Sequence, residues 1–107
     1  MKRIDEVACE SFSHASVNKK VLFRQESCKS NITQLGYTEL LAGEDIGVPC
    51  HPSMEEIFFL INEINEFIID DESILAESES VLRIPSNTNF SLKAITNCKL
   101  YYIGVSI

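Results

Sequence analysis

Apolar and polar residues alternate over several short segments of this chain. Residues 31–41 (NITQLGYTELL) show this alternation, and residues 19–26 (KKVLFRQE) form a similar short segment. Successive side chains of a β-strand point to opposite faces, so a period of two predicts strands with one buried face. Residues 54–62 (MEEIFFLIN) hold more bulky apolar side chains and predict a central strand. Further strands are expected at 81–84, 90–95 and 100–107.

Short polar stretches separate these segments and predict turns. Turns are expected at 42–47 (AGEDIG), 70–73 (DDES) and 77–80 (ESES). A strand through Ile64, Phe67 and Ile69 precedes the second turn, and a brief strand at Ile74-Leu75 follows it. Pro85 lacks a backbone donor and marks a strand end, while Gly36 suggests a β-bulge. The first fifteen residues fit either a strand or a short helical turn. The pattern predicts an all-β sandwich or barrel of eight to ten short strands.

The length and composition suit one soluble domain. The 107 residues are 45% hydrophobic and predict a single domain over 1–107, with residues 1–18 as an N-terminal segment. The longest apolar run, 57–61, is far shorter than the ~20 residues of a membrane-spanning helix. The first ten residues are too acidic for a secretory signal. We therefore expect a cytoplasmic protein without a membrane partner.

The distribution of charge argues against a nucleic-acid partner. The formal net charge is −7, and no Lys or Arg occurs between Lys29 and Arg83. A phosphate-binding surface needs clustered cations, and this chain has no such cluster. The four cysteines, at positions 9, 28, 50 and 98, form no Cys-x-x-Cys pair, so we expect free thiols rather than a zinc ribbon.

One stretch combines Gly, His and Glu at a characteristic spacing. Gly43 is followed by five residues and then by Pro49-Cys50-His51, and Glu56 stands after four more residues. This spacing resembles the first motif of the cupins, which reads Gly, five residues, His-x-His, three or four residues, Glu, six residues, Gly. Pro49 occupies the position of the first His, and Glu63 occupies that of the closing Gly.

Residues 79–94 are similar to the second cupin motif, which reads Gly, five residues, Pro-x-Gly, two residues, His, three residues, Asn. Pro85-Ser86-Asn87 match its centre, and Asn tolerates the positive φ that Gly allows. Phe90 replaces the His, Glu79 the leading Gly and Ala94 the Asn. The resemblance covers residues 35–107 and implies an all-β fold, a single cupin-type double-stranded β-helix (jelly-roll-like) barrel.

In the cupins, three motif His and one Glu hold a divalent metal. His51 and Glu56 are the two such residues that remain here, and neither Pro nor Phe offers a lone pair. Selective sites use three or four protein ligands, so we predict no tightly bound metal and no other cofactor. A weak divalent metal at His51 and Glu56, in a metal-dependent cupin enzyme, is an alternative.

Without a metal, His51 and Glu56 form a candidate proton-transfer pair, with His51 as the base and Glu56 orienting it. Metal-free cupins include epimerases and isomerases that use His as the base, so the resemblance implies an isomerase, epimerase or lyase. Equally, the two groups could form a hydrogen bond that only satisfies them in a pocket. Phe90, Tyr37 and Tyr101 are the candidate substrate-binding residues. Phe90 is alternatively a core residue, and one of the adjacent Tyr101 and Tyr102 faces outward.

The sequence therefore predicts a small barrel that binds a small polar metabolite, a sugar or an acid. The alternative is a non-catalytic small-molecule-binding or sensor module. A homodimer is expected because small barrels have long edges, with residues 1–18 as a candidate exchanged edge strand.

Overall fold

The computed structural model describes residues 3–11, 17–48, 51–61, 65–77 and 79–107. Within these ranges the chain forms ten strands and two short 3₁₀ helices, η1 (Ile4–Glu6) and η2 (Gln25–Ser27). The strands are β1 (Glu10–Ser11), β2 (Asn18–Arg24), β3 (Ile32–Leu40), β4 (Asp45–Val48), β5 (Met54–Leu60), β6 (Asn65–Ile69), β7 (Glu72–Ala76), β8 (Val81–Ile84), β9 (Phe90–Ala94) and β10 (Cys98–Ser106). The predicted all-β class is confirmed.

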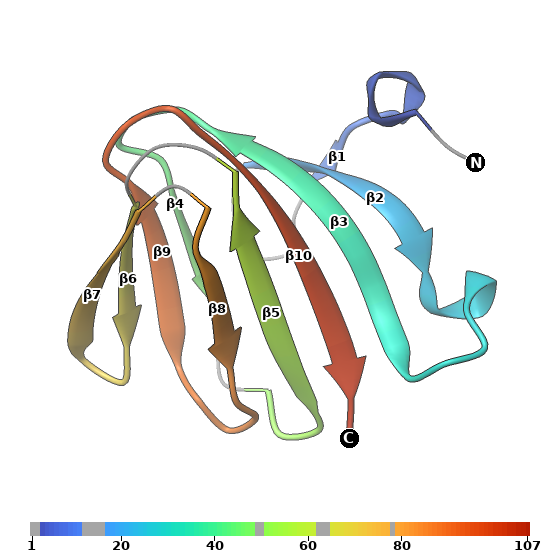
Figure 1. Ribbon diagram of the computed structural model, residues 1–107. Coiled ribbons are helices and arrows are strands. Elements are labelled where there is room, and N and C mark those ends of the chain that lie inside the picture. The colour runs from blue at the N-terminus through green and yellow to red at the C-terminus, as the bar shows by residue number, and fades with distance from the viewer. Residues whose placement is uncertain (1–2, 12–16, 49–50, 62–64, 78) are drawn as a thin grey trace.

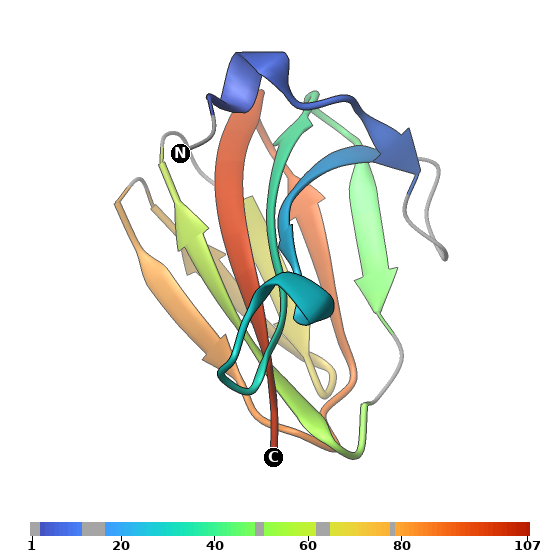
Figure 2. The same cartoon turned by 90° about the vertical axis from the view of Figure 1, so that its right-hand side faces the viewer.

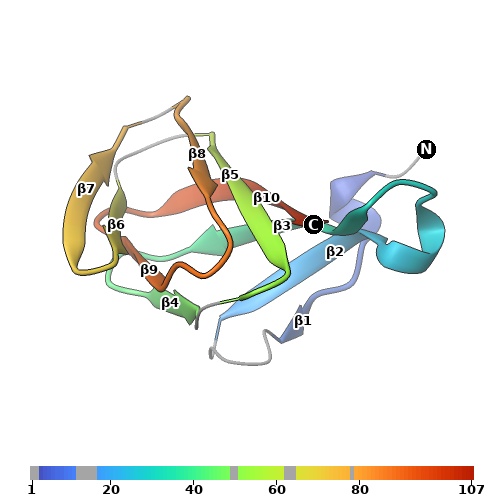
Figure 3. The same ribbon diagram turned by 90° about the horizontal axis from the view of Figure 1, so that it is seen from below.

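The strands form two antiparallel sheets. The larger has the order β1-β2-β3-β10-β5-β8, and the smaller has the order β4-β9-β6-β7. Figures 1 and 3 show the smaller sheet facing one end of the larger sheet, where β10, β5 and β8 lie. At the top of Figure 2, η1 and β1 lie at one end of the strands. The long strand β10 thus lies centrally, between β3 and β5.

Alternation along the strands fills the space between the sheets. In β10 the buried residues Cys98, Leu100 and Tyr102 alternate with the more exposed Lys99 and Tyr101. The hydrophobic core contains large buried side chains from both sheets. These core residues are Leu40, Ile46, Phe58, Leu60, Ile84, Phe90, Leu92, Leu100 and Tyr102. One face of each sheet therefore closes the core, as the period of two predicts.

The predicted turn at residues 42–47 is wrong in its second half. Asp45 to Val48 form β4, which pairs with residues 90–93 of β9. Ile46 is fully enclosed in the core. Asp45 and Gly47 flank Ile46, and both residue types are uncommon in strands. The local pattern therefore does not predict β4, which is stabilised by its pairing with β9.

Several turns require a left-handed backbone. Asp70 and Asp71 both have positive φ, 46° and 70°, and connect β6 to β7 as a two-residue hairpin. This geometry matches the right-handed twist of the strands. It confirms the first half of the turn predicted at 70–73, whereas Glu72 and Ser73 belong to β7. Asn87 has φ 59°, as expected from its position in the second motif. Glu79, in the position of that motif's leading Gly, has φ 62°.

The expected bulge lies opposite Gly36 rather than at it. Val21 and Phe23 pair with Gly36 and Leu35, so Leu22 of β2 is the extra residue. The first residues contain both expected elements, η1 and the two-residue strand β1, which pairs with β2 of the same chain. No helix within the described ranges has the length and apolarity to cross a membrane. Cys9, Cys28 and Cys98 are not disulfide-bonded, and Cys98 is buried.

Candidate functional site

A pocket of about 230 Å³ with both polar and apolar walls opens on the inner face of the larger sheet. Four neighbouring strands, β2, β3, β10 and β5, contribute its walls. Its lining residues are Lys19, Thr33, Gln34, Met54, Glu56, Tyr102 and Gly104. Polar groups from residues far apart in the sequence therefore meet in one small space.

Gly104 forms the floor of this pocket. The register pairs Gly104 with Gln34 on one side and with Glu56 on the other, so these two residues flank it in one row across the sheet. A Cβ at Gly104 would lie 2.4 Å from the Thr33 hydroxyl oxygen and 3.0 Å from the Met54 sulfur. The absence of a side chain here leaves room for Thr33 and Met54, and the Thr33 hydroxyl donates to the Met54 sulfur at 3.1 Å.

Hydrogen bonds fix the wall on the β3 side. The Tyr102 hydroxyl donates to Gln34 Oε1 at 2.7 Å, and Lys19 Nζ donates to the same oxygen at 3.1 Å. An amide oxygen accepts two hydrogen bonds, so Gln34 Oε1 is saturated while its NH₂ group supplies further donors. Hydrogen-bond donors are thus concentrated on the side of the pocket formed by β2 and β3.

Glu56 supplies the acceptor on the β5 side. Burial raises the pKa of the Glu56 carboxyl above its usual value, and the Lys19 ammonium partly offsets this effect. Burial also lowers the pKa of Lys19, against the attraction of the Glu10 carboxylate. Among the described residues no hydrogen bond or ion pair to the Glu56 carboxyl is found. The pocket thus holds two opposite charges that are poorly solvated, a condition common at functional sites.

His51 lies apart from this pocket. It is exposed, and its backbone carbonyl accepts a hydrogen bond from the Asn87 amide at 2.9 Å. It does not contribute to the lining around Glu56. The residues that line this pocket therefore include Glu56 but not His51. Of the pair, Glu56 is the one that faces the pocket.

Phe90 belongs to the core. Its side chain is 6% exposed and packs edge-on against Phe58, with ring centroids 5.4 Å apart. It also borders a separate shallow cavity near the β6–β7 turn, not the pocket at Glu56. Of the two interpretations open for Phe90, its surroundings match the core residue.

Tyr37 and Tyr101 lie together on the opposite face of the sheet from Tyr102. They are cross-strand partners with ring centroids 5.2 Å apart, and the Tyr37 hydroxyl donates to Glu39 Oε1 at 3.1 Å. Burial and this carboxylate raise the pKa of Tyr37 to about 12. The tyrosine that reaches the pocket is Tyr102, whose pKa is raised by burial and by Glu56.

Sequence reasoning missed Lys19, Gln34 and Tyr102. A polar residue on a strand usually faces solvent, so the sequence does not indicate that Lys19 and Gln34 face a pocket. Tyr102 could have been predicted. It lies two residues from Leu100 and two from Gly104, so the side chains of Leu100 and Tyr102 point to the same face of the last strand.

The described residues do not fit a metal centre of the cupin type. Phe90 offers no donor atom at the second-motif position, and His51 does not line the pocket at Glu56. Within the described ranges, no three His, Cys, Asp or Glu side chains gather closely enough to hold an ion. Polar side chains of the protein itself are therefore the groups from which a function must be argued.

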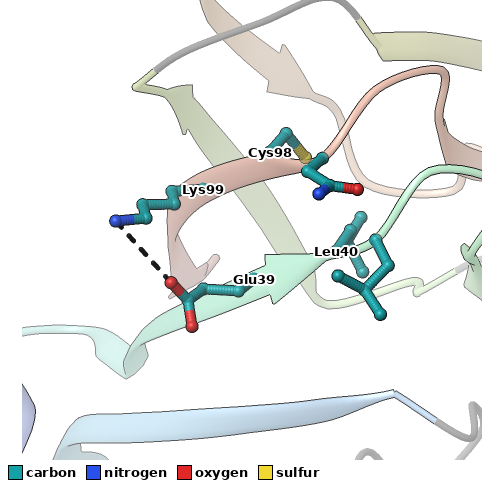
Figure 4. Close-up of a pocket in the computed structure, with 6 residues that line it drawn as sticks. Glu39, Leu40, Cys98 and Lys99 are labelled. Carbon is teal, nitrogen blue, oxygen red and sulfur yellow. Dashed lines mark ion pairs between the residues drawn. The ribbon is translucent and has the colours of Figure 1, made fainter.

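A second cavity, of about 250 Å³, lies where β3 ends and β10 begins (Figure 4). Leu40, Leu41 and Cys98 contribute to its lining, and Glu39 and Lys99 form an ion pair of 3.8 Å beside it. Figure 4 shows these two charged side chains pointing toward each other. Because they neutralise one another, this cavity lacks the converging charges of the pocket at Glu56.

No protein-family model matches the sequence, and no curated protein matches it either. Solved structures match it closely in shape. A predicted oxalate decarboxylase from Thermotoga maritima superposes with a TM-score of 0.89 at 16% identity, covering 98% of this chain and 97% of that chain. The cupin domain of Schizosaccharomyces pombe Cnp3 superposes with a TM-score of 0.79 at 17% identity, covering 98% and 72%.

The cupin domain of an XRE-family transcriptional regulator from Enterobacter cloacae gives a TM-score of 0.71 at 15% identity, covering 81% of this chain and 93% of that one. Identities this low support a shared fold and nothing finer. The two sheets, their strand order and these superpositions agree with the motif resemblance: the chain has the cupin fold.

Proposed function

We propose that this protein binds a small polar metabolite in the pocket between Lys19, Gln34, Glu56 and Tyr102. The observation that carries the proposal is the convergence of these four polar groups, from four neighbouring strands, on one pocket. Small-molecule sites generally combine apolar walls with a few convergent polar groups. Here Met54 and the Tyr102 ring supply the apolar part.

The volume limits the ligand. At about 230 Å³ the pocket is smaller than the ~300 Å³ at the lower end for drug-sized ligands. A sugar or an acid of a few carbons matches this size and the few polar groups among the apolar walls. The proposal requires no metal, because the convergent groups are protein side chains.

The test is a thermal-shift screen with small sugars and carboxylic acids, followed by calorimetry. A true ligand stabilises the folded state by about 2.7 kcal/mol at a hundred times its Kd. Lys19→Met should remove this stabilisation. Lys20→Met is the matched control, because Lys20 is the next residue and donates to the carbonyl of Ile4 instead. Absence of stabilisation by every sugar and acid would overturn the proposal.

A second candidate is an enzyme that moves a proton, an isomerase, epimerase or lyase. The observation that favours it is the desolvated carboxyl of Glu56, since burial raises its pKa toward the range useful for a general base. In this candidate Glu56 abstracts a proton from a carbon of the bound compound. The role of His51 as base stays a prediction, which His51→Ala tests.

Hydrogen exchange separates the two candidates. In D₂O, an enzyme of this kind should exchange a carbon-bound hydrogen of its ligand, and Glu56→Gln should stop the exchange. Binding without exchange would favour the binding module.

A further inference from the structure

The side of the larger sheet that points away from the core carries bulky apolar side chains. Cross-strand partners share a face, so the register shows which residues lie beside Tyr101 on this side. They come from the three neighbouring strands β3, β10 and β5, and we call them the outer apolar face: Leu35, Tyr37, Ile57, Phe59, Tyr101 and Ile103. The border strand β8 extends this face with Val81, the partner of Phe59.

Such a face is unusual for the outside of an antiparallel sheet. When one face packs on the core, the other normally presents polar residues to water. The smaller sheet follows this rule, with Asp45, Lys93 and Glu66 in one outward row across β4, β9 and β6. On the larger sheet Val81 is 59% exposed and Phe59 is 45% exposed, so none of the described elements covers them. A continuous apolar face left open to water marks an interaction surface.

Aromatic side chains occupy the middle of the outer apolar face. Tyr101 lies on the central strand β10, with Phe59 as its partner on one side and Tyr37 on the other. The rings of Tyr37 and Tyr101 are 5.2 Å apart, and the Tyr37 hydroxyl donates to Glu39. The hydrogen bond to Glu39 satisfies the polar end of Tyr37. Buried centres of protein interfaces are enriched in such aromatic residues.

The charges around this face indicate which partner fits it. The formal net charge of −7 makes copies of this chain repel one another in general. At the two ends of the face, however, the charges are balanced, because Glu39 pairs with Lys99 at 3.8 Å and Glu55 pairs with Arg83 at 3.0 Å. Lys20 adds one positive charge on the β2 side. A strongly acidic or basic partner finds little complementary charge here, whereas the same face of another copy matches it in chemistry.

The face is also large enough for a stable dimer. With its charged ends it spans five strands, β2, β3, β10, β5 and β8, and four rows of outward residues. Strands lie ~4.8 Å apart and rows ~6.7 Å apart, so the face covers roughly 650 Å². Two such faces remove roughly 1,300 Å² from water when they pack, which lies within the ~1,200–2,000 Å² of specific interfaces.

We infer that two copies of this chain form a homodimer by packing their outer apolar faces against each other. The sheets then stack about 10 Å apart, as in a β-sandwich, with the side chains of the two faces interdigitating. Two-fold symmetry buries each face against the same face of the other copy. This interface differs from an exchange of residues 1–18 at the sheet edge. It is independent of the pocket at Glu56, which opens on the inner face.

Sedimentation equilibrium of the full chain tests the inference. The unaltered protein should show twice the 12.1 kDa mass of one copy. Phe59→Glu places a charge in the interface twice, because the dimer is two-fold symmetric, and it should raise the dimer Kd about a hundredfold or more. Below the Kd of the unaltered dimer the single chain is present, so unfolding free energies measured there belong to the monomer.

Leu75→Glu is the matched control, because Leu75 is an equally apolar strand residue, 63% exposed, on the smaller sheet. It should leave the dimer intact. Circular dichroism shows whether Phe59→Glu folds, and if it does not, Val81→Glu at the border strand decides, with loss of the dimer again expected. A monomeric unaltered protein at millimolar concentration would overturn the inference. A dimer that resists both face substitutions, as one formed by exchange of residues 1–18 would, or that Leu75→Glu weakens equally, would overturn it too.

Discussion

Gly36 lies directly beneath the ring of Tyr102. The two residues are cross-strand partners, and a Cβ at Gly36 would lie 2.1 Å from Cζ of the tyrosine. This close approach directs the Tyr102 hydroxyl toward Gln34. One glycine therefore determines where a polar wall of the pocket stands.

Gly36→Ala should displace Tyr102 and destabilise the fold by about 1–3 kcal/mol, as expected for overpacking in a filled interior. Chemical denaturation measures this loss. Gly47→Ala is the control, because a Cβ there meets no atom within 4 Å and its φ is not positive. Equal effects of the two substitutions would contradict the packing described here.

Phe90→Ala should cost about 3–5 kcal/mol, because it leaves a cavity against Phe58 in the core. Phe59 is a suitable comparison, since it lies on the neighbouring position to Phe58 and is 45% exposed. Phe59→Ala should cost about 1 kcal/mol or less. Denaturation curves of the two variants measure these losses of unfolding free energy. Similar losses for Phe90→Ala and Phe59→Ala would show that Phe90 is not a core residue.

Glu56 should make the folded state less stable as the pH rises. Its pKa is raised in the folded protein, so between the ordinary glutamate pKa and this higher value the folded state binds more protons than the unfolded chain. Stability contributed by protonated Glu56 is present below this window and is lost as the pH passes through it. Glu56→Gln should therefore gain stability relative to the unaltered protein at neutral pH, and this gain should vanish in acid.

Thermal unfolding across the acidic to neutral range checks this dependence. Glu55→Gln should show the opposite sign at neutral pH, because it loses the 3.0 Å ion pair with Arg83. A stability difference for Glu56→Gln that is independent of pH would contradict the desolvation of this carboxyl. NMR titration of Lys19→Met should give a still higher pKa for Glu56, since the offsetting charge is removed.

Glu79→Gly should stabilise the protein by about 0.5–1 kcal/mol. Glu79 has φ 62°, a conformation that is costly for a residue with a Cβ and free for glycine, and this gain exceeds the extra flexibility of glycine in the unfolded chain. The hydrogen bond from its amide to the Leu60 carbonyl, 2.9 Å long, does not involve the side chain. Glu77→Gly, two residues earlier without positive φ, should destabilise instead. Urea denaturation distinguishes the two signs.

Most of the fold could be predicted because strands such as 32–40 and 98–106 alternate clearly between apolar and polar residues. The strand β4 could not, because its stability comes from pairing with β9. The resemblance to the cupin motifs singled out Glu56 and predicted the left-handed turn at Asn87. The expected homodimer, with residues 1–18 exchanged, stays a prediction.

The pocket was harder to predict than the fold. Lys19, Gln34 and Tyr102 face it because of the pairing register of three strands, and register depends on partners that local pattern does not reveal. His51 was singled out by its position in a motif whose other His positions are altered. A motif position identifies a place in the fold, whereas the direction of a side chain depends on the neighbouring strands.

The central place of β10 between β3 and β5 has a consequence for how the protein is made. Gly104, the floor of the pocket, is inserted between Gln34 and Glu56 only when residues 98–106 join the sheet. Residues 98–106 must therefore have emerged from the ribosomal exit tunnel before a ligand can bind. Until then the earlier strands lack their middle neighbour, and a nascent chain gains no protection from the ligand.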